Sequence, residues 1–149
     1  METKTQKSFV DTGFGFPVHL VNVPMVKVRG IWTPSIDYNK LTRAVLRVIA
    51  YKAGRLTGAE VRFARQHFGL TLQQFGKRLG VSHVAVMKWE KSSRQVTAMN
   101  WATEKDIRLF ILLKLTPSSS QMLSLYSALE EVPSQKAGKI EVTGEGLAA

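Results

Sequence analysis

Hydrophobic and polar positions repeat with two different periods along the chain and divide it into two parts. Residues 16–33, FPVHLVNVPMVKVRGIWT, alternate between the two kinds and are rich in β-branched side chains, which is typical of strands. From residue 37 to residue 131, apolar residues recur every three or four positions, which is typical of amphipathic helices. The pattern therefore predicts an α+β fold, mainly α, in which a small N-terminal β-hairpin and one helix precede a five-helix domain.

The alternating stretch predicts two strands, or three, joined near Asn22–Pro24. Proline cannot donate a hydrogen bond within a sheet, so Pro24 marks the start of a strand or an edge. A lone hairpin is marginally stable in water, so we expect it to pack on a helix, on a partner chain or on its own copy. It is therefore the leading candidate for an interaction surface. Its two faces are expected to carry Val18, Leu20 and Asn22 on one side and His19, Val21 and Val23 on the other.

The first helix is expected over residues 37–53, and Gly54 ends it. Its inward side is a single apolar stripe, which can cover one face of the hairpin. The charged ends of Arg43, Arg47 and Lys52 are expected in solvent. The stripe comprises Leu41, Val45, Val48, Ile49 and the stem of Lys52.

Further helices begin at recognisable N-cap signals. Thr57 and Glu60 have the spacing of a capping box, in which each side chain bonds to the other residue's backbone. Thr103 and Asp106 indicate another helix start, and residues 121–131 indicate a last helix. The apolar face of that last helix is either core or a dimer seam, and core is the favoured interpretation.

Residues 71–91, TLQQFGKRLGVSHVAVMKWEK, predict two short helices joined by a tight turn. Thr71 and Gln74 form the capping box of the first helix. Gly80 follows its last apolar residue, where a left-handed residue ends a helix at least cost. Gly76 falls where the two helices would cross closely, and a side chain there would hold them apart.

The second of these helices runs from its N-cap, Ser82, to about Lys91, and its two sides differ. Val81, Val86 and Trp89 supply the inward side. The other side is basic and suits the major groove of DNA. An ordinary helix pair with a solvated outer face is the alternative, and DNA binding is favoured over it. The outward residues are His83, Val84, Met87, Lys88 and Lys91.

The same stretch resembles the helix-turn-helix of the Cro/C1 (XRE) repressor family. Gly76, the turn residue Gly80, the inward Val86 and the Trp89–Glu90 pair fall in register with that family. The likeness covers somewhat under half of the chain, and Gly76 departs from the alanine that is usual there. The resemblance implies a lambda-repressor-like domain that reads double-stranded DNA, with a homodimer on a palindromic operator.

Residue chemistry suggests how such a surface would bind DNA. Lys88 can donate to guanine O6 or N7, and Val84 or Met87 can contact a thymine methyl. Glu90 is better explained as a structural salt-bridge partner than as a catalytic group. Base reading is expected from His83, Val84, Met87 and Lys88. Phosphate contacts are expected from Arg62, Thr71, Gln73, Lys77, Arg78, Lys91 and Arg94, the last by its place in proteins of the family's fold.

The distribution of charge supports a polyanionic partner. The chain has 149 residues, with 21 Lys and Arg against 11 Asp and Glu, for a net charge of +10. The excess is five in residues 1–53 and six in residues 54–100, whereas residues 101–149 have one more acidic residue than basic ones. The positive charge therefore coincides with the predicted DNA-binding helices and the segment before them.

The sequence lacks the motifs that are typical of several other classes of protein. The chain has no cysteine, which excludes disulfides, thiol catalysis and thiolate metal sites. His19, His67 and His83 do not have metal-ligand spacing, and no carboxylate cluster or nucleotide-binding loop accompanies them, so neither an enzyme nor a cofactor is expected. No apolar run approaches the ~18 residues of a membrane span, and the first residues do not form a signal peptide. A cytoplasmic protein is expected.

The whole layout also resembles the MqsA (YgiT-type) antitoxins, in which a small β-rich module precedes a Cro/C1-type domain. This resemblance implies an N-terminal module that engages a toxin and a DNA-binding domain that represses its own operon. The base-reading arginine and asparagine of that family match Lys88 and Val84. Those proteins hold their N-terminal module with a cysteine zinc site, which this chain lacks, so a plain transcriptional regulator is favoured.

Two alternatives remain at the level of sequence. A protein-interaction module on the same fold would not need a basic face, so the charge argues against it. RNA binding favours exposed aromatic residues, and the candidates, Trp32 and Tyr38, are interpreted as packing residues. The expected division is a flexible arm over 1–13, a hairpin-plus-helix interaction module over 14–55, the DNA-binding domain over 56–132 and a disordered tail over 133–149, in which Ile140 and Val142 would allow a short strand.

Overall fold

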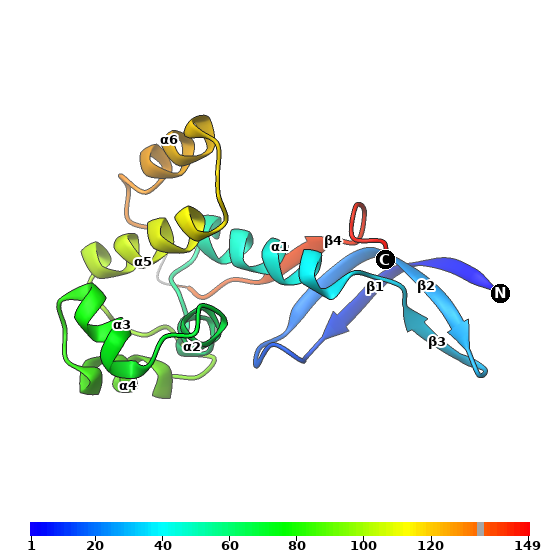
Figure 1. Ribbon diagram of the computed structural model, residues 1–149, viewed down its shortest axis with the longest axis horizontal. Coiled ribbons are helices and arrows are strands. Elements are labelled where there is room, and N and C mark those ends of the chain that lie inside the picture. The colour runs from blue at the N-terminus through cyan, green and yellow to red at the C-terminus, as the bar shows by residue number, and fades with distance from the viewer. Residues whose placement is uncertain (134–135) are drawn as a thin grey trace. The chain divides into compact units, whose positions relative to one another are not determined.

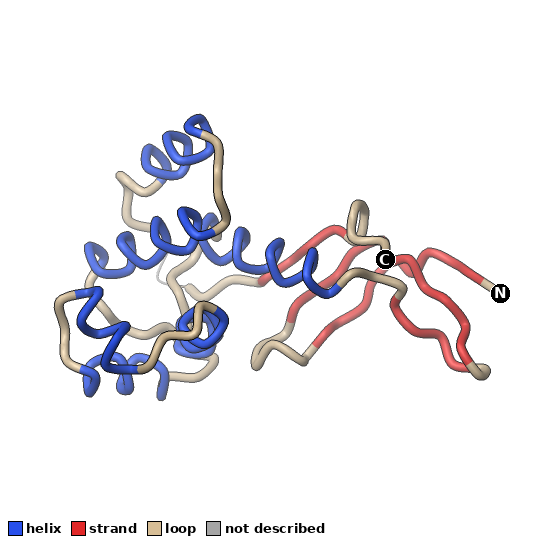
Figure 2. The backbone as a smooth tube through the Cα atoms, in the orientation of Figure 1, coloured by secondary structure: helices blue, strands red, loops and turns tan. Residues whose placement is uncertain are grey.

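The computed structural model describes residues 1–133 and 136–149 of the chain. In the described residues, strands come first, helices follow and a short strand comes last, which is the α+β arrangement that the hydrophobic pattern predicts (Figure 2). The chain forms two compact units, one made of Met1–Val48 with Lys139–Ala149 and the other of Ile49–Gly138. We call them unit 1 and unit 2. Unit 1 therefore contains both ends of the sequence, and its boundary with unit 2 falls within a helix.

Unit 1 is built on a sheet with a long central strand (Figure 1). β2 (Val18–Val28) pairs antiparallel with β1 (Thr3–Asp11) along one edge. Along its other edge, the first half of β2 pairs parallel with β4 (Ile140–Thr143), and its second half pairs antiparallel with β3 (Ile31–Pro34). Two segments from opposite ends of the sequence thus share one edge of the same strand.

The prediction of a flexible arm over residues 1–13 is wrong, because Thr3–Asp11 forms β1. Its side chains are mainly polar and exposed, so no apolar pattern marks it as a strand. Backbone hydrogen bonds to β2 stabilise it, and polar side chains on an edge strand also discourage further pairing.

The predicted break near Asn22–Pro24 is a kink inside one strand. Asn22 has a φ of +56°, and the alternation of side chains shifts there, so that Val23 faces the core together with Leu20. The expected placement of Asn22 and Val23 was therefore wrong. Pro24 accepts a hydrogen bond from Ser35 N at 2.8 Å. Proline has no N–H to donate. In an ordinary residue that group would point to this same edge of β2, between the residues that pair with β4 and those that pair with β3, where no donor is needed.

One face of the sheet is covered by α1 (Tyr38–Tyr51), which supplies Leu41 and Val45 to the core. Leu46 is buried and Val48 is half-buried, so the inward stripe is displaced from the predicted one. The C-terminal segment completes this core with side chains that are 3–7% exposed. They are Ile140, Val142 and Leu147. The prediction of a disordered tail is therefore wrong for residues 139–149, although residues 134–135 lie outside the described part of the chain.

The described residues of unit 2 form five further helices, as predicted for the second part of the chain. They are α2 (Gly58–His67), α3 (Leu72–Leu79), α4 (His83–Lys91), α5 (Trp101–Lys114) and α6 (Ser119–Ala128). The Thr57–Glu60 and Thr71–Gln74 capping boxes both form. The unit encloses a core that includes Leu56, Val61, Ala64, Phe75, Val86, Ile107 and Ile111.

Two predicted helix starts are wrong. α5 begins earlier than Thr103, because the Asn100 side chain accepts a hydrogen bond from Thr103 N at 2.8 Å and caps the helix. α6 begins before residue 121, because Ser118 forms a capping box with Gln121. In both cases the cap lies three residues before the position that had been interpreted as the start. None of the helices in the described residues is long and apolar enough to span a bilayer.

Candidate nucleic-acid interface

The tight turn between α3 and α4 depends on two glycines, as predicted. Gly80 has a φ of +72° and ends α3, and its amide bonds back to Lys77 O. A Cβ on Gly76 would lie 2.7 Å from Val81 O and 3.3 Å from His83 N. The two helices therefore approach more closely at Gly76 than any other residue would allow. The close crossing fixes the direction in which α4 leaves the turn.

α4 has one buried side and one exposed side. Ser82 caps it through a hydrogen bond from Ala85 N, Val86 is fully buried, and the helix packs against α2 and α3. Val84 and Met87 are 39% and 36% exposed. The four residues predicted to read bases all lie on the exposed side. They are His83, Val84, Met87 and Lys88.

An ion pair holds the far end of α4 in place. Arg65 of α2 donates to Glu90 through Nε at 2.6 Å and through a second guanidinium nitrogen at 2.9 Å. A third nitrogen donates to Leu70 O, so one side chain ties α4 to α2 and to the α2–α3 loop. The hydrogen bonds with Glu90 raise the pKa of Arg65. The prediction that Glu90 is a structural salt-bridge partner is confirmed.

The loop after α4 carries Arg94 on an ordered frame. Ala59 N donates to Ser93 O at 2.8 Å, and Gly58 N donates to Gln95 O at 3.3 Å. Ser93 has a φ of +52°, which turns the chain at the loop tip. Arg94 is exposed there. The amides at the start of α2 already donate hydrogen bonds to the carbonyl groups of this loop, so they do not form an anion-binding site.

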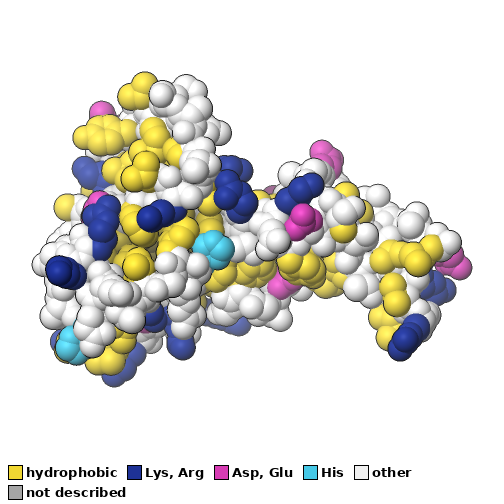
Figure 3. All heavy atoms as spheres, in the orientation of Figure 1, with side chains coloured by type: hydrophobic (Ala, Val, Ile, Leu, Met, Phe, Trp, Pro, Cys, Tyr) yellow, Lys and Arg dark blue, Asp and Glu magenta, His cyan; other side chains and the backbone are white. Residues whose placement is uncertain are grey.

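The other residues predicted to contact phosphate fall into two groups. Arg62, Gln73, Lys77, Lys91 and Arg94 are exposed. Arg78 lies 3.4 Å from the Asp106 carboxylate and 5.0 Å from the centre of the Phe110 ring, so it has structural partners of its own. Thr71 uses its hydroxyl to cap α3. Lys and Arg side chains gather around α4 at the lower left of Figure 3.

The start of α3 keeps open amide groups. The Thr71 hydroxyl and carbonyl accept from Gln74 N and Phe75 N. Within the described residues, the Leu72 and Gln73 amides find no acceptor. Free N–H groups at a helix start attract anions, because the helix dipole adds to their partial positive charge. The exposed side chain of Gln73 lies at the same position.

A buried ionic network was missed by the sequence analysis. The Glu104 side chain is fully buried and accepts from Arg55 Nε at 2.8 Å, from Leu56 N at 3.2 Å and from Arg108. Lys52 was expected in solvent, but its ammonium group is buried against Glu60 at 2.9 Å. The spacing of Glu104 and Arg108, four residues apart on one helix, was the available signal. The network packs the end of α1 onto α5 and is structural.

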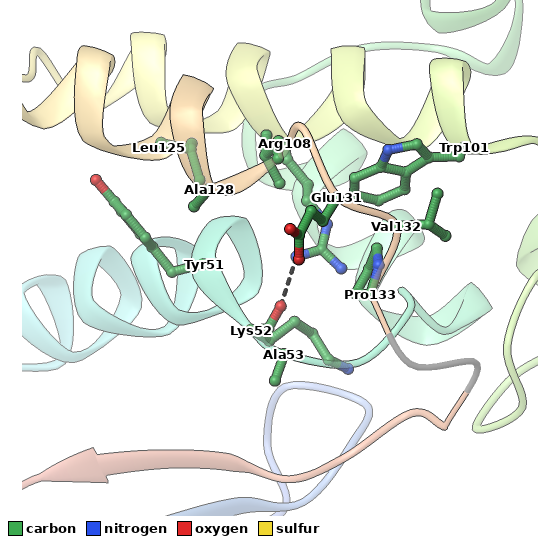
Figure 4. A pocket seen from close by; sticks show the side chains of 11 residues that line it. Tyr51, Lys52, Ala53, Trp101, Arg108, Leu125, Ala128, Glu131, Val132 and Pro133 are labelled. Carbon is green, nitrogen blue, oxygen red and sulfur yellow. Dashed lines mark hydrogen bonds between the residues drawn. The ribbon is translucent and has the colours of Figure 1, made fainter.

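A cavity of about 240 Å³ lies beside this network (Figure 4). Tyr51, Trp101, Leu125 and Val132 are among its lining residues. Every N–H of Arg108 is already directed at a protein acceptor. These acceptors are Glu104 and the carbonyls of Ala50, Lys52 and Gly54. The cavity therefore offers no free guanidinium donor to an anion. No group of three or more His, Cys, Asp or Glu side chains suited to a metal ion occurs in the described residues.

Comparisons with protein-family models, with curated proteins and with solved structures find no match to this chain. The interpretation of the α4 surface therefore rests on its own geometry and chemistry.

Proposed function

We propose that the protein is a sequence-specific double-stranded DNA-binding transcriptional regulator of the repressor type, with α4 as its recognition helix. One observation carries the proposal. α4 is fixed at both ends, by the Gly76–Gly80 turn and by the Arg65–Glu90 ion pair, while its free side holds only exposed residues suited to base edges. A rigid helix with an exposed reading face is what the major groove accommodates.

The reading residues have complementary chemistry. Lys88 provides ammonium donors for guanine O6 and N7, and His83 can donate or accept. Val84 and Met87 present apolar surface for a thymine methyl group. The phosphate contacts come from exposed cations around this face and from the start of α3. They are Arg62, Lys77, Lys91 and Arg94, with Gln73 and the amides of Leu72 and Gln73.

The proposed assembly is a homodimer on a palindromic operator. One short helix reads too few bases for useful specificity, and dimers of helix-turn-helix proteins read half-sites about one helical turn apart. The place of action is operator DNA, which in this proposal lies in the bacterial cytoplasm. An autorepressing antitoxin is a narrower version of the same function.

A second candidate is a protein-interaction module, and one observation favours it. On the sheet face opposite α1, the paired residues Val28 and Ile31 are 46% and 69% exposed. Exposed apolar side chains on an uncovered face are typical of surfaces that bind proteins. This function is compatible with DNA binding, because it uses unit 1 rather than α4, and a toxin would be one such partner.

The test is selection of bound duplexes from a random library with the full chain and with Lys88→Ala. The wild-type protein should recover a palindrome with half-sites about 10 base pairs apart. Lys88→Ala should weaken binding to that site by ~1–3 kcal/mol and relax one base position per half-site. Lys114→Ala, which removes an exposed lysine at the end of α5, is the control and should leave the motif unchanged. Duplex binding with no recovered motif would contradict sequence reading by α4.

A further inference from the structure

Trp32 is the largest side chain of unit 1, yet it lies outside the core. Phe16 is 4% exposed and packs with the buried aliphatic residues, whereas Trp32 in β3 is half-buried. Two ammonium groups lie near its ring. Lys4 Nζ lies 4.4 Å from the ring centre, and Lys27 Nζ lies 5.8 Å from it. A half-buried indole ring close to two cations is available for contacts that a core aromatic residue such as Phe16 cannot make.

The register of the sheet explains how these three residues meet. Met25 faces the core, and Lys27, two residues further along β2, points to the same side. Trp32 is the direct partner of Lys27 in β3, and Lys4 is the direct partner of Met25 in β1. The β2–β3 end of the sheet extends past the start of α1 (Figure 1), and the Trp32 side chain is half-buried.

The adjoining turn adds a further cation. Arg29 and Gly30 have φ values of +52° and +80°, which define a two-residue turn that projects the β2–β3 end into solvent. Arg29 is exposed. Val28 and Ile31 beside it are 46% and 69% exposed and point to the other face of the sheet. Hydrophobic and basic side chains lie together around this turn (Figure 3).

Electrostatic compensation at this end is weak. Glu2 lies 3.8 Å from Lys27, and the two side chains are 70% and 39% exposed. An exposed pair of this length is screened by salt and easily exchanged. The three cations therefore keep a positive field around a flat indole ring, and the lysines that cover the ring are free to move to other anions.

We propose that this end of the sheet is a binding site for single-stranded nucleic acid, in which an unpaired base stacks on Trp32 and flanking phosphates bind Lys4, Lys27 and Arg29. An aromatic platform within a positive groove is the general solution for such strands, because every base has a π face and every nucleotide a phosphate. The alternative is that the lysine stems merely shield the indole ring from water.

The site belongs to unit 1 and does not depend on the proposed function of α4. To test the unit 1 site independently of α4, single-stranded binding is measured in the double variant Lys88→Ala/Arg94→Ala, in which duplex reading by α4 is expected to be lost. The probes are fluorescein-labelled oligo(dT) and oligo(U) of twelve nucleotides, read by anisotropy with the full chain. Intrinsic tryptophan fluorescence is recorded in parallel for the wild type and for Trp32→Phe, so that quenching lost in the variant is assigned to Trp32 and not to Trp89 or Trp101.

The variants separate stacking from charge. Trp32→Leu should weaken oligo(dT) binding by about five- to hundredfold, and Trp32→Phe should retain most of it, because phenylalanine still stacks. Lys4→Gln/Lys27→Gln should weaken binding and lower its salt dependence. Lys139→Ala is the matched control, since this exposed lysine of unit 1 lies at the start of β4, and it should behave as wild type. Oligo(U) binding shows whether RNA serves as well as DNA.

Three results would overturn the proposal. The first is binding of oligo(dT) that is unchanged by both Trp32→Leu and the lysine pair. The second is binding that is lost in the Lys88→Ala/Arg94→Ala background, which would assign it to α4. The third is binding to phosphatidylglycerol vesicles with none to either oligonucleotide, which would make the patch a membrane contact. Circular dichroism of each variant confirms that the sheet is intact before binding is measured.

Discussion

At the scale of a single residue, Glu104 stabilises the charged side chains that are buried in unit 2. Its carboxylate, which is fully buried, bonds to two guanidinium groups and one backbone amide. Those guanidinium groups in turn hold the Met99 carbonyl and the carbonyls at the end of α1. Burial lowers the pKa of Arg108, and the Glu104 charge acts against that shift. The carboxylate is thus the counter-charge for two buried cations.

Glu104→Gln should destabilise unit 2 strongly. The amide cannot neutralise Arg55 and Arg108, which would leave buried charges without compensation, at a cost of about 3–5 kcal/mol in the free energy of unfolding. Urea denaturation followed by circular dichroism measures this. Glu130→Gln, at an exposed position after α6, is the control and should change stability by less than about 0.5 kcal/mol. Equal effects of the two substitutions would show that the network does not stabilise the fold.

Glu60 makes stability depend on pH in the opposite sense to a typical surface carboxylate. Burial raises the pKa of Glu60 above its ordinary value of 4.5, although Lys52 acts to lower it. Between the unfolded and folded pKa values the native state therefore holds the proton more tightly, so this contribution to stability falls as pH rises above 4.5. Glu60→Gln removes the titrating group. The stability of the wild type relative to this variant should decrease from about pH 4 to about pH 7, and an increase over that range would contradict the assignment.

At the scale of elements, the α3–turn–α4 segment is defined by what glycine permits. Gly80 is left-handed with open space around it, whereas Gly76 is crowded by the backbone of the turn. The same residue type thus serves two purposes four positions apart. Substitutions at the two sites should fail for different reasons.

Gly80→Ala should lower the free energy of unfolding by about 1–2 kcal/mol, because its Cβ strains a left-handed backbone. Gly80→Asn should cost less, since asparagine tolerates that conformation, and Gly80→Val should cost most. Thermal unfolding of the three variants gives the order. Duplex affinity measured below the unfolding range should change little, because Gly80 is not among the residues proposed to read bases. Equal costs for the three substitutions would mean that the turn relaxes to a right-handed form.

The helices could be predicted because their capping signals lie close together in the sequence. β1 and β4 could not be predicted with the same ease, because each depends on pairing with a distant segment. The capping boxes at Thr57 and Thr71 and the stop at Gly80 involve residues at most a few positions apart, so the sequence shows them directly. β1 is polar and is held by a partner in β2, and β4 is held by a strand more than a hundred residues earlier. The exposed side of α4 was predictable from periodicity, whereas the buried state of Lys52 depends on Glu60 across a loop.

At the scale of the whole molecule, net charge sets how binding responds to salt. The chain has an excess of ten positive charges, with six of them in residues 54–100. Each phosphate that a cation neutralises releases counter-ions, so affinity for duplex DNA falls with salt in proportion to the number of contacts. The exposed loop residue Arg94 represents one such contact.

Arg94→Ala should weaken binding to all duplex sequences alike and reduce the slope of log affinity against log salt by about 1. Lys88→Ala should instead act chiefly on the preferred site. Fluorescence anisotropy over a series of salt concentrations, with a specific and a random duplex, separates the two effects. A loss confined to the specific duplex in Arg94→Ala would show that this residue reads bases.

The pairing of β4 with β2 has a consequence for the order of events during synthesis. β2 leaves the ribosome early, whereas Ile140 and Val142, which cover its first half, emerge after every helix of unit 2. The nascent chain therefore carries an N-terminal sheet without β4 until the residues of α2 to α6 have been synthesised. We expect the unit that is made first to be the last to reach its native state, which gives a ribosome-bound chain time to form the α4 surface before the sheet closes.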